Sequence, residues 1–213
     1  PWNEWEPGVR DRDPAALEAA RRRLNAEIRF HEWVQYAFES QWRALRERCR
    51  SKGIGLIGDL PFYVPHDSAE VWAHPRLFTL GRRGQPKRVV GVPPDDFAKD
   101  GQLWGFPLYD WDRMRDEGFS WWLSRLRAIL SRFDAVRIDH LIGFHRAWAV
   151  PARLKNSLKG RWDLAGVRPV QAPLPLGPHH HVEAAARIAD QVAQVHGARH
   201  RPDLQVRAAV AGA

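Results

Sequence analysis

The sequence predicts an α/β fold in which parallel strands alternate with helices, as in part of a (β/α)8 barrel. Two short apolar runs, 54–60 and 133–139, each follow a segment with helical spacing, and each carries a carboxylate at its end, Asp59 or Asp139. The order helix, strand, loop, helix, strand is typical of a parallel barrel. The chain has 213 residues, whereas a barrel of average size needs roughly 250. We therefore expect an incomplete barrel.

Residues 1–52 predict a helical segment of the barrel domain. The Asp13-Pro14 pair supplies an N-cap and a first-turn proline, which together start a helix. We expect this helix to run to about Ile28. From 30 to 50, apolar residues recur on one wide helical face, which predicts a second helix that ends at the following glycine.

Residues 53–162 predict barrel strands joined by long loops that cover a binding site. The stretch 61–111 contains prolines, glycines and paired charges without sustained periodicity, so we expect long loops there with one hairpin around 77–90. Helical spacing returns over 118–132, directly before the second predicted strand.

The pattern changes after Trp162, where prolines cluster, His179, His180 and His181 follow one another, and the composition shifts to alanine, arginine and valine. Adjacent side chains point in different directions, so the histidine run does not predict a metal site. We expect 163–213 to be an irregular tail, disordered or read from a shifted frame. The chain opens without methionine, and we expect its true start to lie upstream.

Composition limits the compartment and the partners. Cys49 is the only cysteine, which excludes an internal disulfide, and no stretch approaches the roughly 20 apolar residues of a membrane span. We expect a soluble cytoplasmic protein with no membrane partner. The formal net charge of +8 raises nucleic acid as a partner, but the basic residues form no continuous stripe with interleaved aromatics, so we expect none.

The segment Arg137-Ile138-Asp139-His140 is the first candidate for chemistry. In a strand, Arg137 and Asp139 point to the same side, and a nearby cation favours the ionised carboxylate that a nucleophile requires. A structural ion pair inside a barrel is the more common explanation of the same spacing. Spacing alone leaves both interpretations open.

Five motifs occur in a fixed order along the chain and narrow this choice. They are Gly-Leu-Ile-Gly-Asp-Leu-Pro-Phe-Tyr-Val (55–64), Asp-Ser-Ala-Glu-Val-Trp (67–72), Gly-Val-Pro-Pro-Asp (91–95), Gly-Gln-Leu-Trp-Gly (101–105) and Val-Arg-Ile-Asp-His (136–140). Together they resemble the amylomaltases, the 4-alpha-glucanotransferases of glycoside hydrolase family 77. The resemblance extends from about Trp2 to Trp162.

The resemblance implies an incomplete TIM barrel of the alpha-amylase superfamily type, with helical insertions, that transfers α-1,4-glucan segments with retention. Asp139 would be the nucleophile that forms a glycosyl-enzyme, and Arg137 would hold it ionised. Asp59 and His140 would bind sugar hydroxyls. Asp95 and Trp104 would belong to a loop that covers the substrate and limits water. The implied partners are maltooligosaccharides or starch- and glycogen-type glucans, with no cofactor and no metal.

One departure from the family pattern concerns the proton donor of the reaction. The family supplies its acid/base glutamate from an Ala-Glu-Asp motif and a further aspartate from a His-Asp motif, and neither occurs after Trp162. Loss of a general acid typically costs about 10²–10⁴-fold in rate. We therefore expect impaired transfer by this chain. Two alternatives stay open, a glucan-binding remnant without catalysis and a basic nucleic-acid-binding protein.

Overall fold

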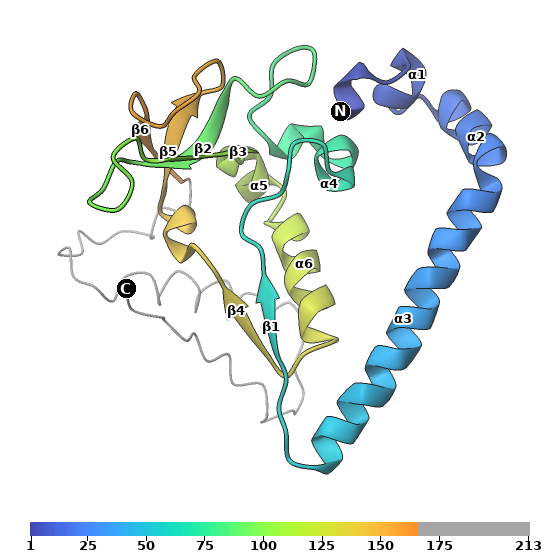
Figure 1. Cartoon of the computed structure of the whole chain (residues 1–213). Helices are drawn as coiled ribbons and strands as arrows, with labels where there is room; N and C mark the ends of the chain where they lie inside the picture. The colour runs from blue at the N-terminus through green and yellow to red at the C-terminus, as the bar shows by residue number, and fades with distance from the viewer. Residues whose placement is uncertain (166–213) are drawn as a thin grey trace.

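The computed structural model describes residues 1–165 and shows a mixed α/β fold with two separate sheets (Figure 1). The strands are β1 (Ile57–Leu60), β2 (Arg88–Val92), β3 (Gln102–Pro107), β4 (Ala135–Ile138), β5 (Arg146–Pro151) and β6 (Arg161–Leu164). The α-helices are α1 (Pro7–Arg10), α2 (Pro14–Arg23), α3 (Asn25–Ser51), α4 (Ala69–Ala73), α5 (Trp111–Asp116) and α6 (Ser120–Leu130). Three 3-10 helices are η1 (Trp2–Glu4), η2 (Pro75–Leu77) and η3 (Leu141–Phe144).

Strands β1 and β4 form the parallel pair that the two apolar runs predict. Their register joins Ile57 to Ala135 and Leu60 to Ile138. Helix α6 precedes β4 in the chain and contacts both strands, as in a β–α–β unit. Within residues 1–165 no further parallel strand joins the pair, so the predicted barrel is represented here by two strands and does not close.

A four-stranded antiparallel sheet, in the order β3-β2-β5-β6, corrects the prediction of loops across 61–111. Strands β2 and β3 lie inside that stretch. Val90 of β2 and Val150 of β5 are both fully buried, because β-branched side chains suit a covered pleated face. The sequence pattern did not predict these strands because glycines and prolines interrupt the alternation of apolar and polar residues. The predicted hairpin at 77–90 is reduced to one isolated bridge between Leu80 and Pro86.

The two predicted N-terminal helices exist, but the break between them is earlier than expected. The Asp13 carboxylate accepts from the Ala16 amide at 2.9 Å, so the N-cap prediction is confirmed. Helix α2 ends at Arg23 rather than near Ile28. Leu24 has φ −99° and ψ 19°, which separates α2 from α3.

Aromatic rings fill the core between the two sheets and α6. Phe62, just past the end of β1, lies 4.7 Å from the Phe144 ring and 5.1 Å from the Trp122 ring, centroid to centroid. Trp122 and Phe144 are each 1% exposed. Ring pairs at these separations add to the hydrophobic gain from burial. Trp2, Trp121 and Trp122 are thus buried core residues.

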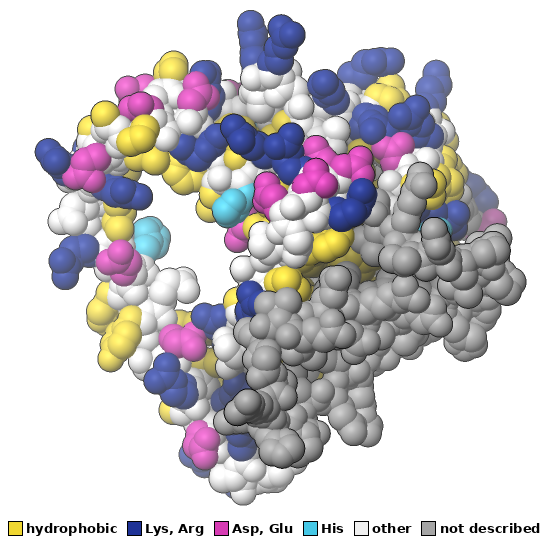
Figure 2. Space-filling view, turned by 180° about the vertical axis from the view of Figure 1, so that it is seen from behind, with side chains coloured by type: hydrophobic (Ala, Val, Ile, Leu, Met, Phe, Trp, Pro, Cys, Tyr) yellow, Lys and Arg dark blue, Asp and Glu magenta, His cyan; other side chains and the backbone are white. Residues whose placement is uncertain are grey.

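Helix α3 stands apart from the rest of the molecule (Figure 1), and Figure 2 shows an open gap between this arm and the body. No residue of α3 is buried, and Tyr36 is 71% exposed. Its attachment lies near its C-terminal half, where Arg46 and Arg50 both bind the Asp134 carboxylate at 2.9 Å. Across residues 1–165, no helix has the length and apolar character needed to span a membrane.

The strand β6 continues to Leu164 and pairs with β5 through Ala147–Asp163. The ordered sheet therefore includes the first two residues of the predicted tail. The remainder of that tail from residue 166, with the histidine run, lies outside the described residues.

Candidate active site

The carboxyl ends of β1 and β4 bring the predicted charged residues together. Asp59 and Arg137 are direct partners in the parallel register, and the Arg137 guanidinium donates a hydrogen bond to Asp59 Oδ2. Both side chains are about half exposed. The hydrogen bond to Asp59, and then the Asp59 charge, raise the pKa of Arg137, and the Asp139 charge adds to this. Parallel α/β barrels place functional groups at this end of their strands.

Asp139 follows the last residue of β4 and is exposed. Directly after it, His140 adopts a left-handed backbone with φ 53° and ψ 46°, a conformation that costs a non-glycine residue roughly 1 kcal/mol. This turn redirects the chain into η3. There, Gly143 packs so closely on Phe62 that a Cβ would lie 2.4 Å from the Phe62 ring. The tight turn therefore fixes the backbone around Asp139.

Aromatic rings enclose the His140 imidazole. The Trp104 ring lies 4.8 Å away in an edge-on arrangement, and the Tyr63 ring lies 5.7 Å away. Burial lowers the pKa of His140, and the nearby Asp139 charge partly opposes the shift. The shift favours the neutral imidazole, which can both donate and accept a hydrogen bond. Trp104 is itself steered by a bond from its Nε1 to Gln102 Oε1 at 3.1 Å.

The Asp95 carboxylate bonds within its own loop and not to the other predicted site residues. It lies in the loop between β2 and β3, where its Oδ1 accepts from the amides of Phe97 at 2.9 Å and Ala98 at 2.6 Å. These bonds form an Asx turn that shapes the loop. Contacts thus connect Asp59 with Arg137, and His140 with Trp104. The Asp139 charge acts on Arg137 and on His140, while the hydrogen bonds of Asp95 stay within its own loop.

The segment after β1 supports this cluster and contains residues that sequence reasoning missed. The Tyr109 hydroxyl and the Arg125 guanidinium both donate to the Phe62 carbonyl, and Arg125 also donates to the Pro61 carbonyl at 2.6 Å. The Arg125 cation lies over the Trp121 and Trp122 rings at 4.7 and 4.9 Å. The sequence signal that could have identified these residues is the position of the segment, directly after a predicted barrel strand.

Tyr63 is the clearest missed residue. Its ring contacts both His140 and Trp104, and burial raises the pKa of its hydroxyl. That hydroxyl is buried and has no hydrogen-bond partner among residues 1–165. An unsatisfied buried donor is costly.

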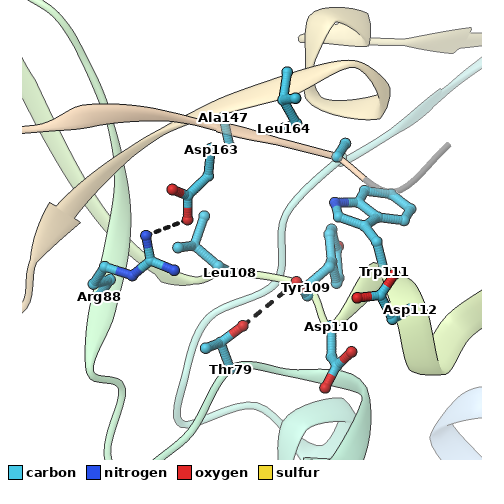
Figure 3. A pocket seen from close by; sticks show the side chains of 11 residues that line it. Thr79, Arg88, Leu108, Tyr109, Asp110, Trp111, Asp112, Ala147, Asp163 and Leu164 are labelled. Carbon is cyan, nitrogen blue, oxygen red and sulfur yellow. Dashed lines mark hydrogen bonds and ion pairs between the residues drawn. The ribbon is translucent and has the colours of Figure 1, made fainter. Parts of the chain in front are cut away.

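A pocket of about 270 Å³ lies elsewhere, beside the antiparallel sheet (Figure 3). Arg88 and Asp163 form an ion pair on one side of it, and Trp111 lies on the other. None of the six predicted site residues lines it. In the described part of the chain, no group of three His, Cys, Asp or Glu side chains is arranged to hold a metal ion.

Comparison with known proteins places these features in context. The sequence profile described as 4-alpha-glucanotransferase matches residues 1–174, which extends past Trp162. A 4-alpha-glucanotransferase of Thermus thermophilus is 48% identical over 162 residues, covering 76% of this chain and 32% of that protein. The chloroplastic/amyloplastic 4-alpha-glucanotransferase of Solanum tuberosum is 44% identical over 169 residues, covering 79% and 29%.

A solved structure gives the same result in three dimensions. The amylomaltase of Streptococcus agalactiae in complex with acarbose aligns with a TM-score of 0.73 at 42% identity, covering 78% of this chain and 34% of that one. The chain therefore spans about a third of the length of the relatives it matches.

Proposed function

Because the chain belongs to the 4-alpha-glucanotransferase family, we propose that Asp139 is the nucleophile of a retaining transfer between α-1,4-glucans. The supporting observation is its position at the carboxyl end of β4, beside the Asp59–Arg137 pair and the enclosed His140. In the first step the Asp139 carboxylate bonds to the anomeric carbon while the bond to the leaving sugar oxygen breaks. In the second step the hydroxyl oxygen of another glucan bonds to the anomeric carbon, the bond to Asp139 breaks, and a base takes up the hydroxyl proton.

The neighbouring groups have distinct tasks in this proposal. Arg137, bonded to Asp59, keeps a positive charge next to the attacking carboxylate. The His140 imidazole and the Asp59 carboxylate bind sugar hydroxyls. Trp104 gives an apolar face to the sugar, and Asp95 fixes the covering loop, so both limit the access of water. We place the reaction in the cytoplasm, with maltooligosaccharides or starch-type glucans as substrates and without a cofactor or metal.

No Ala-Glu-Asp motif follows Trp162 within these 213 residues, so the test of Asp139 must not depend on a general acid. A sugar alkoxide is a poor leaving group and needs a proton from such an acid. Fluoride leaves as a stable anion and needs no such proton. A maltotriosyl fluoride therefore tests Asp139 without a general acid.

The experiment combines the chain with α-maltotriosyl fluoride and follows fluoride release and the mass of the intact protein. We expect one glycosyl adduct on the peptide that contains Asp139. Asp139→Asn abolishes both signals, whereas Asp116→Asn, an exposed carboxylate at the end of α5, leaves them unchanged. Equal fluoride release by chain and Asp139→Asn, without an adduct, would refute a nucleophilic role.

A second candidate is a glucan-binding module without catalysis, favoured by the same absent acid motif. It predicts that acarbose or maltoheptaose binds to the chain and to Asp139→Asn with equal affinity, while the fluoride donor gives no adduct. Titration calorimetry with both variants separates this outcome from the proposed transfer half-reaction.

A further inference from the structure

A second pocket, of about 330 Å³, is lined by an unusual concentration of cations. Its lining includes six arginines and two aspartates, namely Arg10, Arg12, Arg76, Arg82, Arg83, Arg113, Asp11 and Asp110. It lies between the N-terminal segment, η2 and the turn at 81–84. None of the proposed active-site residues lines it, so any ligand here is separate from the reacting glucan.

Ion pairs account for only part of this charge. Arg10 binds the Asp11 carboxylate through two nitrogens at 2.7 and 2.8 Å, and Arg113 lies 4.0 Å from Asp110. Both aspartates of the lining are thereby matched to one arginine each.

The other four arginines have no carboxylate within ion-pair distance among residues 1–165. Arg12 is half-buried and donates to the carbonyls of Arg10 at 3.2 Å and Trp72 at 2.7 Å. Arg76, Arg82 and Arg83 are exposed. The lining thus carries a formal excess of four positive charges, six minus two.

The turn that carries two of these cations is firmly held. The Gly84 amide donates to the Gly81 carbonyl at 3.0 Å, and His66 bonds the Gly84 carbonyl at 2.7 Å. Gly84 has φ +76° and lies against Trp2, which is 4% exposed. A Cβ at this position would lie 2.5 Å from the Trp2 ring. Arg82 and Arg83 therefore project from a fixed turn rather than from a free loop.

We propose that this pocket binds the phosphoryl group of a small phosphate ester of about hexose size. A phosphomonoester carries about −1.5 to −2 charge and three acceptor oxygens, and guanidinium forks match those oxygens well. The volume, at the lower end of about 300–1,000 Å³ for ligand sites, accommodates one sugar ring beside the phosphate. Phe78 and Leu80 supply an apolar wall for that ring.

The test measures binding to the whole chain by calorimetry at constant ionic strength. The probes are glucose 6-phosphate, glucose 1-phosphate, inorganic phosphate, sulfate and glucose. We expect the hexose phosphates to bind more tightly than inorganic phosphate or sulfate, and glucose not to bind at this pocket. A phosphate that binds as tightly as the hexose esters would identify the free ion as the ligand and would reject the ester.

A charge-matched pair of variants controls for simple screening. Arg82→Gln with Arg83→Gln removes two cations from the pocket, and Arg21→Gln with Arg23→Gln removes two from the exposed surface of α2. Losing two charge-assisted bonds should weaken hexose phosphate binding by at least about 100-fold in the first variant, with less than about twofold change in the second. Equal losses in both variants would show non-specific charge attraction and sink the proposal.

Chemical protection gives a second readout that needs no variant. Phenylglyoxal modifies accessible arginines, and peptide mass mapping locates the products. Glucose 6-phosphate should protect Arg76, Arg82 and Arg83 but not Arg21 or Arg23. Protection of these residues by a short DNA duplex at lower concentration than by glucose 6-phosphate would instead identify a nucleic-acid surface and overturn the assignment.

Discussion

Asp59 and Arg137 are register partners across the β1–β4 pair, and their side chains are hydrogen-bonded at the carboxyl end of both strands. The cation that the sequence places near Asp139 is thus bonded to Asp59, and the Asp139 charge also acts on it. Asp59 and Arg137 neutralise each other where both side chains are about half exposed.

Replacement of Arg137 tests that shared charge. Arg137→Met removes the cation from both Asp59 and Asp139, and we expect the rate of adduct formation with maltotriosyl fluoride to fall by about 10²-fold, the size of a lost electrostatic contact in an active site. Stability should change by less than about 1 kcal/mol because the pair is exposed. Thermal unfolding separates the two effects, and a rate within threefold of the original would contradict the role.

The lowered pKa of His140 predicts that the stability of the fold depends on pH. Burial places its folded pKa below the ordinary 6.5, so the unfolded chain takes up a proton at higher pH than the folded chain does. The free energy of unfolding is therefore highest above about 6.5 and falls as pH drops towards the folded pKa. His140→Asn, which tolerates the left-handed backbone, should flatten the slope in urea titrations from pH 8 to 5. His31→Asn, on the exposed face of α3, should leave it intact.

The lowered pKa of Asp134 predicts a second dependence of stability on pH, in a more acidic range. The amide of Leu56 and then Arg46 lower its pKa from 3.8 to about 2. The resulting stabilisation is present above about 3.8 and is lost as pH falls to about 2. After allowance for solvent exposure, Asp134→Asn should cost about 1–2 kcal/mol at pH 6 and almost nothing at pH 2. Unfolding of Asp134→Asn and of the exposed control Asp112→Asn at both pH values measures this difference.

Tyr63→Phe should separate stability from ligand binding. Its buried hydroxyl has no partner among the described residues, so removal should leave stability unchanged or raise it by about 1 kcal/mol. If a sugar hydroxyl satisfies this group, acarbose binding weakens by about tenfold in the same variant. A stability loss above 1 kcal/mol would indicate an internal partner instead.

Arg125→Met should loosen the segment that carries Tyr63. The variant loses the bonds to the Pro61 and Phe62 carbonyls and the cation–π contacts with two tryptophans. We expect a loss of about 2–4 kcal/mol, with Arg125→Lys recovering part of it. The matched control is Arg115→Met, which removes an exposed arginine of α5. Differential scanning calorimetry compares the two variants.

Sequence reasoning predicted local features better than distant pairings. Helix caps such as Asp13 and the apolar runs of β1 and β4 are encoded within a few residues, and the structure confirms them. The antiparallel sheet depends on pairs such as Gly91 with Trp148. Local periodicity does not predict such pairs because the two residues are far apart in the chain. The enclosure of His140 likewise depends on Trp104 and Tyr63, which lie far away in the chain.

Strands β1 and β4 pair only with each other within residues 1–165, so each has an outer edge of unpaired backbone groups. Such an edge is a template for another strand. A strand added at either side would extend the ladder without disturbing the Asp59–Arg137 register. The carboxyl end of the β1–β4 pair is therefore set by the register of these two strands and does not depend on how many strands lie beside them.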